Sequence, residues 1–111
     1  MLCLVTDRRR AAPRDHTEAG RARTVVSLIA DAAAAGIDLI HIREADLSSR
    51  ALHALVASAV EVTRGSRSRV VVNDRADVAL AAGADGVHLA AAGPPIDDIR
   101  GLGPRGWLVG R

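Results

Sequence analysis

Short apolar runs alternate along the chain with longer stretches in which apolar residues recur at helical spacing. The apolar runs cover residues 2–6, 37–42, 69–72 and 86–89, and a further run begins at Trp107. The helical stretches cover 24–35, a segment from Ser48 or Ser49 to about residue 64, and 75–82, and a glycine follows each of them. Runs of this length fit buried strands, and glycine commonly follows the last residue of a helix. The alternation of strand and helix therefore predicts an α/β fold with a parallel sheet and right-handed crossovers.

Two segments lack this periodicity. Residues 11–23 are polar and include Pro13 and Gly20, so we expect a loop that leads into the helix at residue 24. Residues 92–106 are rich in proline and glycine, and we expect a loop there with at most one helical turn.

An internal repeat narrows the fold. The stretches AAGIDLIHI (34–42) and AAGADGVHL (81–89) align without a gap at an offset of 47 positions. The offset spans two strand–helix units, which makes the second and fourth strands equivalent. In a (β/α)₈ barrel, alternate strands contribute side chains to the same interior layers. We therefore expect residues 1–111 to form one domain, a partial (β/α)₈ TIM barrel made of about the first four and a half β/α units.

Composition excludes several kinds of function. The chain has 22 alanines, one Trp and no Phe or Tyr, and all 15 of its cationic residues other than histidine are arginines. Without lysine there is no Schiff-base catalysis and no lysine clamp on a phosphate. No apolar run approaches the roughly 18 residues of a membrane span, and Cys3 is the only cysteine, so no internal disulfide forms. We expect a cytoplasmic protein that does not bind membranes.

A run of arginines, Arg8, Arg9 and Arg10, leaves two interpretations open. Such a run can bind anions or nucleic acid, or it can be a solvated loop. No aromatic residues accompany it to stack on bases, so we expect no nucleic-acid partner.

Polar side chains gather where the second and third strands end. Strand side chains alternate, so Ile40 and Ile42 should pack on helices while His41 and Arg43 point into the barrel. Asn73 and Asp74 follow the third strand. Ligands bind at this carboxyl edge in parallel α/β folds. An arginine fork and an amide suit phosphate oxygens, and a carboxylate can hold Mg²⁺.

Each of these residues also has a purely structural interpretation. Asp74 can be the N-cap of the next helix. Arg43 can form an ordinary ion pair with Glu44 or Asp46. His41 and His88 can be hydrogen-bonded interior groups. No cysteine and histidine spacing indicates zinc, and no glycine-rich phosphate loop of a common type is present.

The stretches GIDLIHIREADLSSR, VVVNDRADVALAAGADGVHL and WLVGR resemble the thiamine-phosphate synthase/TenI family, and the resemblance runs from Leu2 to the last residue. It implies a (β/α)₈ barrel. It also implies an Mg²⁺-dependent enzyme that joins hydroxymethylpyrimidine diphosphate to a thiazole phosphate, giving thiamine phosphate and diphosphate. TenI-like members include a thiazole tautomerase, and a non-catalytic member that binds a thiazole or a phosphate is a further alternative.

Carried over residue by residue, the resemblance is incomplete. The synthase pattern Gln-x-Arg-x-Lys is His41, Arg43 and Ala45 here. The family's diphosphate-binding Asn and first metal-binding Asp match Asn73 and Asp74. The second metal-binding Asp has no counterpart in residues 90–93, which read Ala-Ala-Ala-Gly. The resemblance thus implies diphosphate binding by His41, Arg43 and Asn73, a metal ligand at Asp74, and a weakened Mg²⁺ site, and it leaves the catalytic residue unassigned.

Closure of a barrel needs more strands than these. We expect the chain to be the N-terminal half of a longer gene product that is inactive by itself. A short chain that pairs with itself or a partner, and a decayed sequence, are the alternatives. The exposed half-barrel should then self-associate.

Overall fold

The computed structural model describes residues 1–111 and contains one five-stranded sheet, in the order β1-β2-β3-β4-β5, in which every neighbouring pair is parallel. The strands are β1 (Cys3–Val5), β2 (Leu39–Ile42), β3 (Arg69–Asn73), β4 (Gly86–His88) and β5 (Leu108–Gly110). The helices are α1 (Arg8–Ala11), α2 (Glu18–Ala34), α3 (Ser49–Thr63), α4 (Ala76–Ala81) and α5 (Ile96–Arg100). Spatial order follows chain order, as it does in a β/α barrel, and the predicted parallel α/β fold is confirmed.

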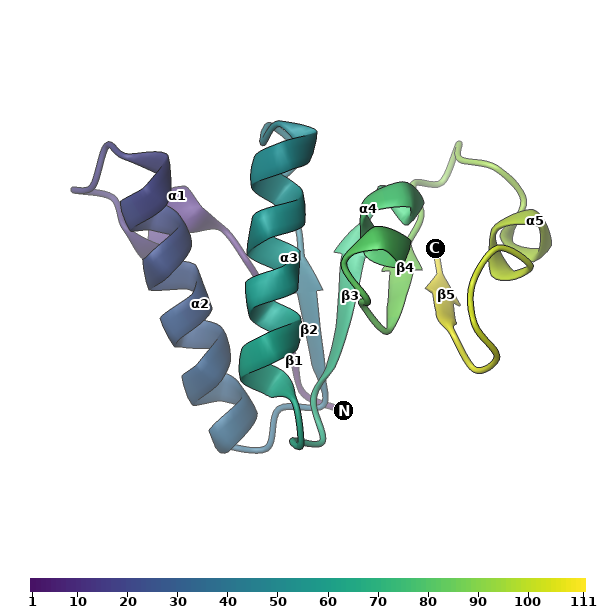
Figure 1. Cartoon of the computed structure of the whole chain (residues 1–111), viewed down its shortest axis with the longest axis horizontal. Helices are drawn as coiled ribbons and strands as arrows, with labels where there is room; N and C mark the ends of the chain where they lie inside the picture. Colours follow the sequence, from purple (N-terminus) through teal and green to yellow (C-terminus); the bar gives the residue numbers. More distant parts are fainter.

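Helices α2, α3 and α4 lie on the same face of the sheet (Figure 1). The core forms between this face and the helices, and its fully buried side chains include Ile29, Ile40, Ile42 and Val56. Ile40 and Ile42 therefore point toward the helices, as the strand alternation predicts. On the opposite face, which we call the uncovered face, Val5 is 49% exposed and Leu108 is 37% exposed.

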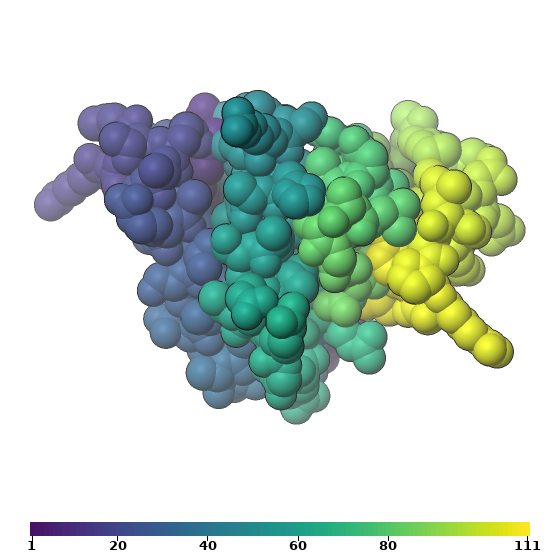
Figure 2. Space-filling view, viewed as in Figure 1, coloured from purple at the N-terminus to yellow at the C-terminus, as the bar shows by residue number.

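The molecule is elongated along the direction in which the strands succeed one another. Its extents are 41 × 28 × 21 Å, and the two ends of the chain's colour range occupy opposite ends of the space-filling view (Figure 2). In the strand order, β1 and β5 are the two edges of an open sheet. No helix is long and apolar enough to cross a membrane.

The prediction that 11–23 is a loop is wrong from Glu18 onward, and a short helix before this segment was missed. Helix α2 begins at Glu18, where the Thr17 hydroxyl accepts a hydrogen bond from the Gly20 N–H at 3.0 Å. Helix α1 was not predicted, and it is capped by Asp7, whose carboxylate accepts from the Arg10 N–H. The first turns of α1 and α2 are stabilised by side-chain caps and consist mostly of polar residues, so no apolar periodicity indicates where these helices begin.

Strand β5 packs closely on β4 at Gly86. A Cβ at this position would lie 2.0 Å from the carbonyl oxygen of Leu108, so only glycine allows the observed approach. The segment before β5 is anchored by Trp107, which is buried and whose indole N–H donates to the Ala84 carbonyl oxygen at 3.1 Å. The predicted helical turn in 92–106 is α5.

Candidate functional site

Three polar side chains form a row on the uncovered face at the carboxyl ends of β2, β3 and β4. The Nε2 atom of His41 lies 3.2 Å from the Asn73 Oδ1 atom. The ring of His88 lies beside that of His41, with centroids 4.9 Å apart. Because the amide oxygen only accepts, this contact places the proton of a neutral His41 ring on Nε2.

The environment of His41 favours the uncharged ring. Partial burial lowers the pKa of His41, and the positive charge of Arg43 and the neighbouring His88 lower it further, while the hydrogen bond to Asn73 acts in the opposite direction. Burial removes water from the imidazolium form, which is why it dominates. His41 is therefore neutral at pH 7, as a hydrogen-bonded interior group would be.

Arg43, at the end of β2, lines a hollow of about 450 Å³ together with His41, Asn73, His88 and Arg111, and it also borders a second hollow on the side of Glu44 and Asp46. Its side chain is exposed and forms no ion pair. The alternative interpretation, that Arg43 pairs with Glu44 or Asp46, is wrong, since both carboxylates bond to Arg8 instead. The hollow thus holds two guanidinium groups and two imidazoles, and no carboxylate lines it.

Asp74 does not cap the following helix. The N-cap of α4 is Arg75, and no side chain caps its first turn. Asp74 is the one non-glycine residue with a positive φ, at 61°, and its Oδ1 atom accepts from the Ala90 N–H at 3.2 Å. Its own N–H donates to the His88 carbonyl oxygen at 2.7 Å. The left-handed backbone turns the carboxylate toward the end of β4, so the N-cap expectation is wrong.

These residues do not fit a resident Mg²⁺. No group of three or more His, Cys, Asp and Glu side chains converges anywhere in the structure. Asp74 supplies a single carboxylate, and one of its oxygens already accepts the Ala90 N–H. Mg²⁺ takes near-octahedral oxygen ligands, and in phosphate-binding sites one or two carboxylates are completed by the substrate phosphates and by water. We therefore assign no role to a metal held by these residues alone.

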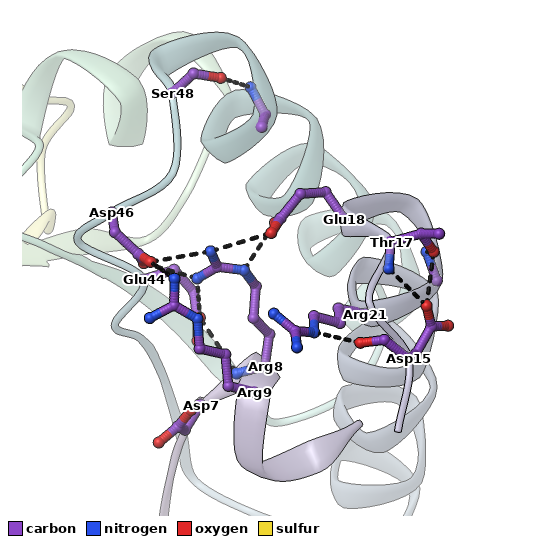
Figure 3. A network of polar contacts seen from close by, with 12 residues as sticks. Asp7, Arg8, Arg9, Asp15, Thr17, Glu18, Arg21, Glu44, Asp46 and Ser48 are labelled. Carbon is purple, nitrogen blue, oxygen red and sulfur yellow. Dashed lines mark hydrogen bonds and ion pairs between the residues drawn. The ribbon is translucent and has the colours of Figure 1, made fainter. Parts of the chain in front are cut away.

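The residue that sequence reasoning missed is Arg8. Only 4% of its side chain is exposed, and its guanidinium makes five hydrogen bonds, to Glu18, Glu44 and Asp46 (Figure 3). Arg9 beside it is 63% exposed and pairs with Asp46. The interpretation of the whole run as a solvated loop is therefore wrong at Arg8. The available signal was the pair of acidic residues directly after β2, because the carboxyl ends of neighbouring parallel strands meet.

Arg8 also determines the protonation of its exposed partner. The hydrogen bond from Arg8 lowers the pKa of Asp46 to about 2, and the bonds that Arg8 donates to Asp46, Glu18 and Glu44 raise the pKa of Arg8 despite its burial. Arg8 and Asp46 are therefore both charged at neutral pH, and the network joins α1, α2 and the loop between β2 and α3.

Comparison with known proteins gives consistent matches over nearly the whole chain. A family model described as thiamine monophosphate synthase matches residues 2–111. A thiamine-phosphate synthase of Methanoculleus marisnigri is 44% identical over 91 residues, which cover 82% of this chain and 43% of the relative. A thiamine-phosphate synthase of Methanoregula boonei is 36% identical over 109 residues, 98% of this chain and 46% of the relative.

A solved structure extends the match to the fold. The thiamine phosphate pyrophosphorylase of Pyrococcus furiosus superposes with a TM-score of 0.75 at 28% identity, over 97% of this chain and 47% of that one. The chain spans about half the length of the relatives it matches. The sequence resemblance and the predicted fold class are thereby confirmed. With its parallel sheet and a family match over residues 2–111, the chain belongs to the thiamine monophosphate synthase family.

Proposed function

We propose that this chain belongs to a thiamine-biosynthesis enzyme and that His41, Arg43 and Asn73 bind the diphosphate or phosphate group of a thiamine precursor. The observation that carries the proposal is that Arg43, which forms no ion pair, lines a hollow together with Asn73 and two imidazoles and without a carboxylate. A guanidinium presents parallel N–H donors to phosphate oxygens, and an amide adds a further donor.

The reaction that suits these groups is the transferase reaction of the synthases. The thiazole nitrogen forms a bond to the pyrimidine methylene carbon, the bond from that carbon to the diphosphate oxygen breaks, and diphosphate leaves. Negative charge accumulates on the leaving group, so a fixed cation beside it stabilises the transition state. Arg43 would supply that charge in this chain, and Asn73 would orient the diphosphate.

A thiazole tautomerase is the second candidate. It is favoured by His41, Ala45 and residues 90–93, where the synthase pattern has a glutamine, a lysine and a second carboxylate. A site of this kind needs to hold only the phosphate of a thiazole. A binding protein without catalysis would use the same hollow. We place the activity in the cytoplasm, where an unpaired cysteine such as Cys3 stays reduced.

The test is a calorimetric titration of the chain with inorganic diphosphate, with a thiazole phosphate and with a pyrimidine diphosphate, each with and without Mg²⁺. We expect Arg43→Ala to weaken diphosphate binding by about tenfold or more, since charge-assisted bonds are the strongest of those available here. Arg50→Ala is the matched control, because Arg50 is exposed, forms no ion pair and lies outside the hollow. It should leave the Kd within about twofold.

The outcomes separate the candidates. Binding of thiazole phosphate alone favours the tautomerase, and binding of both precursors favours the synthase. Tight diphosphate binding that requires Mg²⁺ would show that the bound diphosphate completes a metal site that these residues do not form alone. Equal losses in Arg43→Ala and Arg50→Ala would refute the site. We expect no turnover by residues 1–111 alone, and thiamine phosphate formation above the blank would overturn this.

We also propose that the uncovered face binds a second copy of the chain. Its exposed apolar side chains, Val5 and Leu108, flank the polar row, and the edge strands β1 and β5 have unpaired backbone groups along one side. Exposed edges and apolar faces of this kind pair readily with another sheet.

A further inference from the structure

The backbone amide of Arg43 is held by a side chain from the neighbouring strand. The Arg43 N–H donates to the hydroxyl oxygen of Thr6 at 3.1 Å. Thr6 directly follows β1 and is buried, with 6% of its surface exposed. The site residue is thus attached to the end of β1 through one hydroxyl group.

The direction of this hydrogen bond is imposed by Glu44. The Thr6 hydroxyl donates to Glu44 Oε2 at 2.7 Å. A carboxylate accepts hydrogen bonds and cannot donate them, so the single hydroxyl proton must face Glu44. The lone pairs of Thr6 are then turned toward the Arg43 N–H, and an alternative hydroxyl rotamer would leave the carboxylate without this donor.

Glu44 is itself immobilised by Arg8. Its Oε1 atom accepts from the Arg8 backbone N–H at 3.2 Å and from Arg8 Nη1 at 3.0 Å. Glu44 is 3% exposed and Arg8 is 4% exposed, so water does not compete for these bonds. The remaining guanidinium donors of Arg8 bond to Glu18 and Asp46, as Figure 3 shows.

We propose that Thr6 and Glu44 are positioning residues for Arg43. They form a hydrogen-bonded relay, defined as Arg8, Glu44, Thr6 and the Arg43 N–H, that fixes the backbone from which the Arg43 side chain reaches into the hollow. Neither Thr6 nor Glu44 lines the hollow, so the relay acts through Arg43 and not on the ligand. The inference rests on the proposed role of Arg43 in binding a phosphate group.

The test compares Thr6→Val, which keeps the shape of the side chain and removes the hydroxyl, with Thr6→Ser, which keeps the hydroxyl. The probe is inorganic diphosphate, titrated calorimetrically into the full 111-residue chain. We expect Thr6→Val to weaken binding about three- to tenfold, the range of one lost hydrogen bond, and Thr6→Ser to restore it to within about twofold. If Thr6→Val does not fold, judged by circular dichroism, Thr6→Ala removes the same hydroxyl without a bulky replacement.

A double-mutant cycle distinguishes positioning from general damage. In an Arg43→Ala background, the Thr6→Val substitution should have no further effect on the Kd, because the hydroxyl that it removes contacts only Glu44 and the Arg43 N–H, while the backbone bond from Thr6 to the His41 carbonyl oxygen is kept. An equal loss in both backgrounds would overturn the proposal.

Hydrogen exchange at the Arg43 amide supplies a readout that needs no ligand. Exchange should be faster in Thr6→Val than in the unsubstituted chain and unchanged in Thr6→Ser. If the unsubstituted chain fails to bind diphosphate, the proposed function fails, and exchange still decides whether the relay exists. Unchanged exchange in Thr6→Val would refute the relay whatever the binding result.

Discussion

Replacing Arg8 by methionine tests how much the buried network contributes to stability. Arg8→Met keeps a long side chain of similar shape and removes the charge. It leaves Glu44, which is 3% exposed, without its guanidinium partner. Removing one member of a buried ion pair typically costs about 3–5 kcal/mol, because the other charge remains desolvated.

The contacts that remain around Glu44 indicate that the loss of stability in Arg8→Met lies at the lower end of the range of about 3–5 kcal/mol. Glu44 keeps its hydrogen bonds from Thr6 and from the backbone N–H of residue 8. The other two partners, Glu18 and Asp46, have side chains that are 54% and 46% exposed, so losing their pairing costs less than about 1 kcal/mol each. We expect a loss of about 3 kcal/mol in the free energy of unfolding, a large share of the 5–15 kcal/mol of a typical domain.

The assay is urea unfolding followed by circular dichroism, with Arg9→Met as the control. The Arg9 side chain is 63% exposed and pairs with the same Asp46, so its loss should cost less than about 1 kcal/mol. Adding Glu44→Gln to Arg8→Met removes the stranded charge and should recover part of the stability. If Arg8→Met is no more destabilising than Arg9→Met, the network does not stabilise the fold as argued.

Three further predictions follow from particular contacts. Because the pKa of His41 is lowered in the folded chain, protonation of the ring opposes folding, and the stability that the neutral ring provides is present above about pH 6.5 and is lost as the pH falls below it. Between pH 7 and pH 5, the free energy of unfolding should therefore fall more for the unsubstituted chain than for His41→Gln, and equal losses in chemical unfolding would contradict this. Gly86→Ala must displace the Leu108 carbonyl group, so it should lower the free energy of unfolding, measured in urea, by about 1–3 kcal/mol. In Gly101→Ala the added Cβ would lie 3.7 Å from its nearest neighbour, so the loss should stay below about 1 kcal/mol. An equal effect of both substitutions would refute the close approach of β4 and β5. In sedimentation velocity the chain should associate with itself through the uncovered face, Val5→Glu should weaken that association, and a compact monomer that binds no hydrophobic dye would argue against it.

The repeating pattern of the chain was sufficient to predict the sheet and the faces of its strands. Alternation placed Ile40 and Ile42 against the helices, and the glycines after the helical stretches marked where α2, α3 and α4 end. The pattern failed where local capping replaces apolar periodicity, at α1 and the first turns of α2. It also failed at Arg8, whose partner Glu44 is 36 positions away and is brought near only by the pairing of β1 with β2.

The sequence predicted that His41 and Asn73 lie at the same edge of the sheet, and it did not predict the detailed contacts there. Strand order alone brings His41 and Asn73 to one edge, because parallel neighbours end together. That Arg43 stays without an ion pair could not be predicted in the same way, because the two carboxylates near it in sequence, Glu44 and Asp46, bond to Arg8. The backbone conformation at Asp74 depends on the end of β4, which a local pattern does not describe.

The positive φ of Asp74 is a requirement of the backbone turn, and it is independent of the negative charge of the side chain. Asparagine tolerates a left-handed backbone at least as well as aspartate, and its amide oxygen can accept the same N–H from Ala90. The turn therefore requires a short side chain with an oxygen, and it does not require a negative charge. Asp74→Asn would keep the shape of the strand end while changing the local electric field, so any property that it alters belongs to the charge and not to the fold.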